Sequence, residues 1–212
     1  MPKNEDKSAL PFVPKTKSLV TLRRASKLCR GCDLYKHATQ TVFGRGKPTA
    51  QLFIVGEQPG SSEDIAGEPF VGPAGKLLGR ALSEVGLQSH DYYVTNAVKH
   101  FKFVVRGKNR VHQKPKITEI RACKPWLRAE LEALQPKLIL CLGKTAAESV
   151  LGRSVMVLKE RGKATLLDAR WTVIPTIHPS SLLRMPSHEE RERAYRAFVK
   201  DLRTAVRILS RN

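Results

Sequence analysis

The sequence lacks the features of a membrane or secreted protein. No apolar run approaches the ~18 residues that a membrane-spanning helix needs. Residues 1–17 are polar and have no apolar stretch like that of a signal peptide, so we expect a disordered basic tail there. Residues 18–212 are enough for one core, and we expect a single domain in a monomeric, cytoplasmic protein that binds no membrane.

Acidic residues are also scarce. The chain has 19 Asp and Glu against 38 Lys and Arg, which gives a formal net charge of +19. The excess is uneven, because residues 92–118 contain several Lys and Arg but no Asp or Glu. Such a charge distribution favours a polyanionic partner, with nucleic acid ahead of an acidic membrane surface. The alternative is a basic surface that is merely solvated.

Cysteine is limited to four residues. Cys29 and Cys32 have the two-residue separation common on one side of a metal site, and Cys123 and Cys141 supply two further thiols. In a cytoplasmic chain of this size, metal or redox use is favoured over disulfides. Four thiolates suit zinc or an iron–sulfur cluster equally well, and the spacing does not choose between them. Cys141, inside an apolar run, also fits a plain core residue.

Apolar segments that read as strands alternate with segments of helical periodicity. Strands are expected at residues 51–55, 92–96, 137–142 and 171–177. Helices are expected at residues 75–85, 118–134, from 143 onward and at 187–209, whereas the basic stretch up to Pro115 predicts a loop. Alternating strands and helices predict a three-layer α/β/α fold with a central four-stranded parallel sheet.

Polar residues follow three of these strands directly. Glu57 and Gln58 lie in a Gly- and Pro-rich turn after the first strand, Asn96 ends the second, and His178 follows the last. The carboxyl ends of parallel strands share one edge of the sheet, where open α/β folds place their ligands. We therefore expect these side chains to converge on one crevice.

The motifs around these residues resemble those of the uracil-DNA glycosylase superfamily, most closely its iron–sulfur (family 4) branch and, within it, the UdgX proteins. The resemblance covers nearly the whole chain from Cys29 to Arg184. It rests on residues 56–60 and their continuation to 75, on residues 94–99 and on residues 178–184. The UdgX mark is a basic insertion, usually Lys-Arg-Arg-Ile-His, which here reads Lys-Asn-Arg-Val-His at 108–112. Asn109 replaces an Arg of that pattern and Val111 replaces its Ile. A second departure lies in the first motif, where Ser61 stands at a position that tends to carry Asp in UdgX proteins.

The resemblance implies excision of uracil from DNA followed by covalent capture of the abasic sugar. Glu57 would support positive charge on the sugar, His178 would donate to uracil O2, and His112 would attack the sugar. The residues implied in uracil binding are Gln58, Asp64, Phe70 and Asn96. The amide of Asn96 matches uracil O4 and N3–H, and Phe70 is placed to stack on a flipped base.

Further residues are implied in binding DNA and a cofactor. The contacts to the DNA backbone would come from Lys108, Arg110, Ser180, Ser181 and Arg184. The cofactor would be a structural [4Fe–4S] cluster held by Cys29, Cys32, Cys123 and Cys141. The partner would be uracil-containing DNA, either single-stranded or with the base flipped out.

Two alternatives to covalent capture stay open. One is a conventional multiple-turnover family 4 glycosylase in which His112 only contacts DNA. The other is a non-catalytic iron–sulfur protein that binds nucleic acid or carries electrons. Taken on its residues alone, His112 among basic neighbours fits a solvated histidine beside phosphates.

Overall fold

A central sheet of five strands organises the computed structural model, which describes residues 7–210. Its strands are β1 (Leu52–Gly56), β2 (Tyr92–Asn96), β5 (Leu138–Leu142), β6 (Thr165–Leu167) and β7 (Trp171–Thr176). In the order β2-β1-β5-β7-β6, the first four run parallel, as predicted, and β6 pairs antiparallel with β7. The sequence reading missed β6 because three residues are too short to show a strand period.

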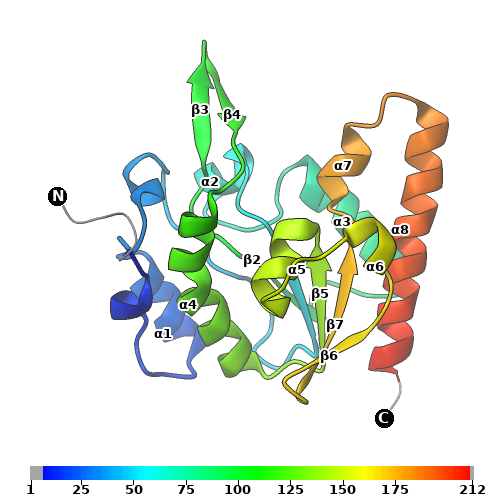
Figure 1. Cartoon of the computed structure of the whole chain (residues 1–212), viewed down its shortest axis with the longest axis horizontal. Helices are drawn as coiled ribbons and strands as arrows, with labels where there is room; N and C mark the ends of the chain where they lie inside the picture. Colours follow the sequence, from blue (N-terminus) through cyan, green and yellow to red (C-terminus); the bar gives the residue numbers. More distant parts are fainter. Residues whose placement is uncertain (1–6, 211–212) are drawn as a thin grey trace.

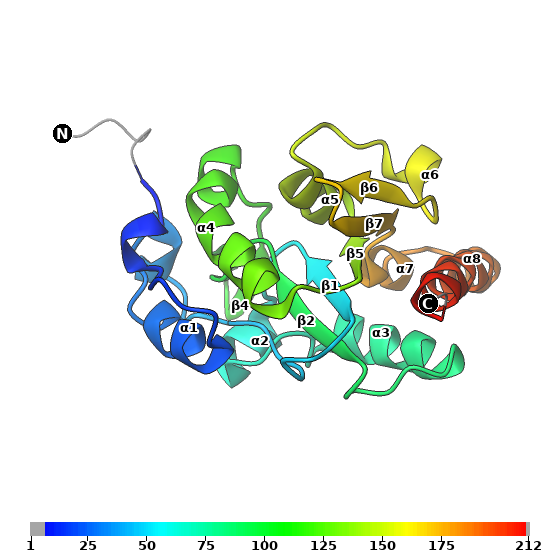
Figure 2. The same cartoon turned by 90° about the horizontal axis from the view of Figure 1, so that it is seen from below.

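Both faces of the sheet are covered by helices, which gives the expected three layers (Figure 2). Ile54 and Leu140 point to the face covered by α3 (Pro73–Glu84), α7 (Pro179–Leu183) and α8 (His188–Leu209). Phe53 and Ile139, one residue earlier on the same strands, point to the face covered by α4 (Ile117–Leu134) and α5 (Lys144–Leu151). This alternation follows from the two-residue period of a strand, and it divides the core into two clusters.

The N-terminal segment packs against the outer side of α4. It comprises η1 (Leu10–Phe12), α1 (Leu19–Ser26) and η2 (Asp33–Lys36). The tail expected to be disordered is instead structured from residue 7 onward, because the Ala9 N–H donates to the Ala122 carbonyl at 2.8 Å and Ala9 is buried. Gly31 permits this approach, since a Cβ there would lie 2.5 Å from Ala9 N. Residues 1–6 of that expected tail lie outside the described residues.

The basic stretch expected to be a loop forms a β-hairpin instead. Strands β3 (Phe103–Arg106) and β4 (Asn109–His112) pair antiparallel and stand out beyond the carboxyl edge of the sheet (Figure 1). Gly107 opens the two-residue turn with φ +57°, a conformation that favours glycine. Because such a hairpin pairs its backbone locally and stays largely exposed, the sequence showed no apolar period there.

Two shorter helices complete the structure, α2 (Ser61–Ala66) after β1 and α6 (Val157–Glu160) before β6. Within residues 7–210, no helix is both long enough and apolar enough to cross a membrane.

A buried ion pair fixes the end of β2. The Lys99 ammonium donates to Glu130 on α4, to Thr95 Oγ1 at 2.6 Å and to the Asn96 carbonyl at 2.7 Å. The other Glu130 oxygen accepts from the Tyr93 hydroxyl at 2.9 Å. Both charged side chains are fully buried, so each offsets the other's loss of hydration by water.

Removing one partner of this pair should destabilise the fold strongly. Lys99→Met should lower the free energy of unfolding by about 3–5 kcal/mol, because Glu130 is left buried without a counter-charge. The double variant Lys99→Met/Glu130→Gln should recover part of that loss. Lys144→Met, which removes one partner of an exposed pair with Glu148, should cost no more than about 1 kcal/mol. Equal losses for the two lysine variants in urea denaturation would contradict this account.

Candidate active site

A cavity of about 800 Å³ opens at the carboxyl edge of the sheet. The loops after β1, β5 and β7 and the last residue of β2 contribute to its wall, as do β4 of the hairpin and α7. Chain order reverses between β1 and β5, since β2 lies to one side and β7 to the other. Such a switch point leaves a crevice between the diverging loops, and the cavity occupies it.

Glu57 lies at this switch point, beside the histidine of the hairpin. Its Oε1 is 3.7 Å from His112 Nε2, and its Oε2 accepts a hydrogen bond from Thr145 Oγ1 at the start of α5. The Glu57 side chain is only 23% exposed, which limits screening of its charge by water. The arrangement holds a carboxylate next to an imidazole inside the cavity.

Gln58 connects the hairpin to the end of β1. Its Nε2 donates to His112 Nε2 at 2.8 Å and to the Gln113 carbonyl at 2.9 Å, while its Oε1 accepts from the Lys102 N–H at 3.0 Å. An amide N–H can only donate, so His112 Nε2 is an acceptor and the proton of the neutral ring is on Nδ1. Partial burial lowers the pKa of His112, assisted by the charge of Arg184 and opposed by Glu57. His112 is therefore a neutral imidazole with its lone pair inside the cavity.

Asn96 offers an unused acceptor at the bottom of the cavity. Its Oδ1 is buried and has no hydrogen-bond partner among the residues the structure describes. A Cβ on Gly56 would lie 2.3 Å from this oxygen and 2.7 Å from Phe70 Cζ, so glycine is required there. Phe70 itself adopts φ +57°, which is unfavourable for a residue with a side chain. Together, Asn96 and Phe70 provide a polar edge beside an aromatic face, suited to a flat ring that has an N–H group.

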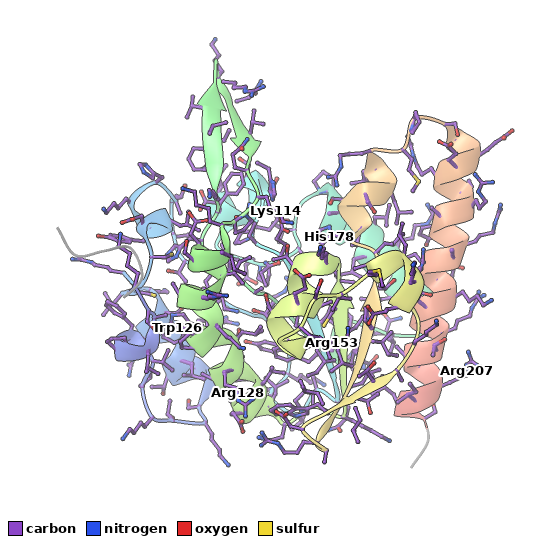
Figure 3. The ribbon with its side chains drawn as sticks, in the orientation of Figure 1. Lys114, Trp126, Arg128, Arg153, His178 and Arg207 are labelled. Carbon is purple, nitrogen blue, oxygen red and sulfur yellow. The ribbon has the colours of Figure 1, made fainter. Side chains whose placement is uncertain are left out.

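His178 provides a hydrogen-bond donor on the same cavity wall (Figure 3). Its Nδ1 accepts from the backbone N–H of Ser180 at 3.2 Å and contacts Ser180 Oγ at 2.8 Å. Burial lowers the pKa of His178 to about 4, with smaller contributions from Arg184 and His112. The neutral ring then has its proton on Nε2, free to donate to a ligand.

The other predicted DNA and ligand contacts divide between the cavity and the rest of the surface. Ser180 and Arg184 line the cavity, and the Ser181 hydroxyl donates to the His178 carbonyl at 2.7 Å. Lys108 is exposed in the hairpin turn. Asp64, expected to bind the ligand, is fully buried and pairs with Arg110 instead of lining the cavity.

Two cavity residues, Lys144 and Thr145, were not predicted from the sequence. Lys114, which the basic stretch suggested as a phosphate contact, also lines the wall and is labelled in Figure 3. For Thr145 a signal did exist, because it follows the apolar run of β5 and Gly143, whose φ is +86°. That is the same strand–turn pattern that identified Glu57.

Three of the four cysteines gather away from this cavity, between α4 and the N-terminal segment. Cys29, Cys32 and Cys123 are buried in one cluster, and a charged Cys29 thiolate would raise the pKa of the Cys32 and Cys123 thiols. Burial is the main cause that raises the pKa of Cys32 to about 11 and of Cys123 to about 12. Cys141 lies in a different cluster on β5, where burial alone raises its pKa.

Two N–H groups point at these thiols. The Trp126 indole N–H donates to Cys29 Sγ at 3.1 Å, and the Lys99 backbone N–H donates to Cys123 Sγ at 3.3 Å. Such donors stabilise thiolates, the form that binds a metal. In residues 7–210 as folded, however, no three His, Cys, Asp or Glu side chains are close enough together to hold a metal ion.

Comparisons with known proteins find similar sequences over most of the chain. A family model described as the uracil DNA glycosylase superfamily matches residues 43–203. A type-4 uracil-DNA glycosylase of Archaeoglobus fulgidus is 37% identical over 181 residues, covering 82% of this chain and 87% of the relative. Another of Thermotoga maritima is 39% identical over 166 residues, covering 78% and 83%. A type-5 uracil-DNA glycosylase of Pyrobaculum aerophilum is 29% identical over 182 residues, covering 77% and 76%.

The partly buried, neutral His178 should make folding stability depend on pH. An unfolded histidine has a pKa near 6.5, whereas the folded His178 has a pKa of about 4, so the unfolded chain binds more protons between these values. Relative to His178→Gln, the wild type should therefore lose up to about 3 kcal/mol as the pH falls from about 6.5 to about 4. Urea unfolding at several pH values measures this difference. A wild-type curve parallel to that of the variant would show that His178 titrates normally.

Proposed function

This chain belongs to the uracil-DNA glycosylase superfamily, and we propose that it excises uracil from DNA and then becomes covalently linked to the abasic sugar through His112. The observation that supports capture most directly is the position of His112 Nε2, 3.7 Å from Glu57 Oε1 at the edge of the cavity that contains Asn96. The nucleophile and the carboxylate that would stabilise the sugar cation therefore face the same space.

Uracil recognition would depend on the unused oxygen of Asn96. Its Oδ1 accepts the uracil N3–H, its Nδ2 donates to O4, and Phe70 stacks on the ring. Cytosine presents a bare N3 and an amino group at those positions, so both amide atoms of Asn96 would face the wrong partner. A site built to pair buried polar groups rejects a ligand that leaves them unpaired.

Bond cleavage would use the charge of Glu57 and the proton of His178. The bond between C1′ and N1 breaks with both electrons leaving on uracil, and His178 Nε2–H donates a hydrogen bond to O2 as negative charge develops there. The carboxylate of Glu57 stabilises the positive sugar. Preorganised groups of this kind, in a partly buried cavity, act on charge that appears only in the transition state.

Capture would follow by attack of His112 Nε2 on C1′. Nε2 already has a free lone pair, so no base is needed for the attack. Gln58 must release its hydrogen bond to Nε2, and it keeps its contacts with Lys102 and Gln113. The alkylated ring is positively charged until the Nδ1 proton leaves to solvent, to which the half-exposed side chain has access.

The DNA backbone would contact exposed cations at the rim of the cavity. Lys114, Lys144 and Arg184 line that rim, and the hairpin presents Arg106 and Lys108 beyond it. Contacts of this kind give affinity without sequence preference and weaken as salt is raised.

The fate of the sugar distinguishes covalent capture from ordinary turnover. Wild type mixed with uracil-containing oligonucleotide should give a shifted band that survives boiling in SDS, and thymine- or cytosine-containing DNA should give none. His112→Ser should abolish the band and still release free uracil, because water can then reach C1′. Glu57→Gln should weaken release and band together, by about a hundredfold or more, because the charge that stabilises the sugar cation is lost.

Ser181→Ala is a matched control, since the hydroxyl that it removes donates to the His178 carbonyl and not to either histidine ring; it should keep most of the band. A band that persists in His112→Ser would require another nucleophile. Repeated uracil release by the wild type without any band would favour a multiple-turnover family 4 enzyme, and intact DNA without free uracil would favour a non-catalytic protein.

We also propose a structural [4Fe–4S] cluster held by Cys29, Cys32 and Cys123. The resemblance to family 4 and the shared position of these thiols support it, with two N–H donors directed at them. For the fourth ligand we propose His100 in place of Cys141. His100 is buried and directly follows Lys99, whose N–H contacts Cys123, whereas Cys141 packs in a separate cluster. Bound there, the cluster would join the N-terminal segment to α4.

Iron analysis of purified variants tests this ligand set. The wild type should contain about four irons per chain and absorb broadly near 400 nm, as [4Fe–4S] proteins do. Cys123→Ser and His100→Ala should lose most of the iron, while His100→Cys and Cys141→Ala should keep it. Loss of iron in Cys141→Ala with retention in His100→Ala would restore Cys141 as the ligand, and a colourless, zinc-loaded wild type would exclude the cluster.

A further inference from the structure

Arg110 was expected to bind a DNA phosphate, but its side chain is directed into the protein. Its Nη1 pairs with Asp64 Oδ2 at 2.6 Å, and its Nη2 donates to Ser61 Oγ at 2.9 Å and to the Ser61 carbonyl at 3.2 Å. A further contact at 3.2 Å joins Nη1 to Thr39 Oγ1. The Arg110 side chain is 22% exposed and that of Asp64 is not exposed at all.

Two aromatic rings at the base of the hairpin also contact the Arg110 guanidinium. Its carbon lies 5.6 Å from the centre of the Phe101 ring and 5.2 Å from that of Phe103, within the range of a cation–π interaction. The two rings stack on each other with 5.0 Å between their centres. Phe101 also lies 6.1 Å from the ring of His112.

The strand register then relates Arg110 to His112. Both belong to β4, two residues apart, so their side chains project from the same face of the hairpin. Opposite them on β3 are Val105 and Phe103 respectively. Val104 and Val105 are exposed, so the hairpin is held by Arg110 and, at its base, by the Gln58 contacts. Fixing Arg110 therefore helps to fix the face that presents His112 to the cavity.

From these contacts we infer that Arg110 is a positioning residue, which holds the hairpin on Asp64 so that His112 can reach the sugar. The inference rests on the proposed capture by His112 and adds what makes that capture geometrically possible. Asp64, in turn, acts through Arg110 and not on the base. A lysine cannot replace Arg110, because a single ammonium cannot reach Asp64 and Ser61 as a planar fork does.

The key variant is Arg110→Lys, which keeps the positive charge but loses the planar guanidinium that contacts Asp64 and Ser61 together. Its hairpin amides, 103–112, should exchange with deuterium faster than in the wild type. Capture measured in a single turnover should slow by about a hundredfold, as for a displaced nucleophile, while uracil release should change by less than about threefold. The slope of log affinity against log salt should not change.

Asn109→Ser is the matched control, because Asn109 is exposed in the same hairpin and carries no charge. It should leave the hairpin protected from exchange, and capture and the salt slope should match those of the wild type. Asp64→Asn should resemble Arg110→Lys, and adding Arg110→Lys to Asp64→Asn should cost little more, since both variants break the same contact.

Two results would overturn the inference. One is an Arg110→Lys protein whose hairpin stays protected and whose capture matches the wild type. The other is a salt slope for Arg110→Met reduced by about one unit with release and capture falling together, which would make Arg110 a phosphate contact. If the wild type forms no adduct, the proposed capture fails, and hydrogen exchange alone then decides whether Arg110 fixes the hairpin.

Discussion

The end of strand β2 is fixed by the buried pair of Lys99 and Glu130, and the base-binding end of the cavity depends on it. The Lys99 ammonium holds the Asn96 carbonyl, and the Lys99 backbone N–H contacts Cys123 on α4. Through one residue, the sheet edge, the helix and the thiol cluster are therefore joined. Because both charges are fully buried, neither side chain can move without losing the counter-charge beside it. The Oδ1 atom of Asn96, which accepts no hydrogen bond from the described residues, is thereby held in a fixed position where a ligand can donate to it.

In the cavity beside that edge, His112 and His178 are neutral, and the carboxylate of Glu57 lies close to His112. Hydrogen bonds from Gln58 and Ser180 set opposite tautomers, so His112 presents a lone pair and His178 presents a proton. Burial lowers the pKa of both rings. Two residues of the same type thereby obtain different chemical roles from their neighbours. The position of His112 also depends on the hairpin, because this histidine belongs to a projecting element that must be held against the rest of the domain.

The sequence predicted the parallel strands and the convergence of Glu57, Asn96 and His178, because strand ends are marked by apolar runs that stop at a turn. The hairpin was not predicted, since its pairing is local and exposed and leaves no apolar period. The direction of Arg110 was also beyond prediction: a basic residue in a basic stretch suggests phosphate, and only the fold brings Asp64, 46 positions away, beneath it. Likewise, the resemblance implied Cys141 as a ligand, whereas Cys141 packs on β5 in a different buried cluster from the other three cysteines.

Counting the products formed by each chain tests the central claim most directly. With uracil-containing oligonucleotide in excess, free uracil and intact-mass adduct should be measured in the same reaction over time. The account predicts that both rise together and stop at one uracil and one adduct per chain, with the added mass located on the peptide that contains His112. Uracil release that continues well beyond one per chain, with most of the protein unmodified, would contradict it.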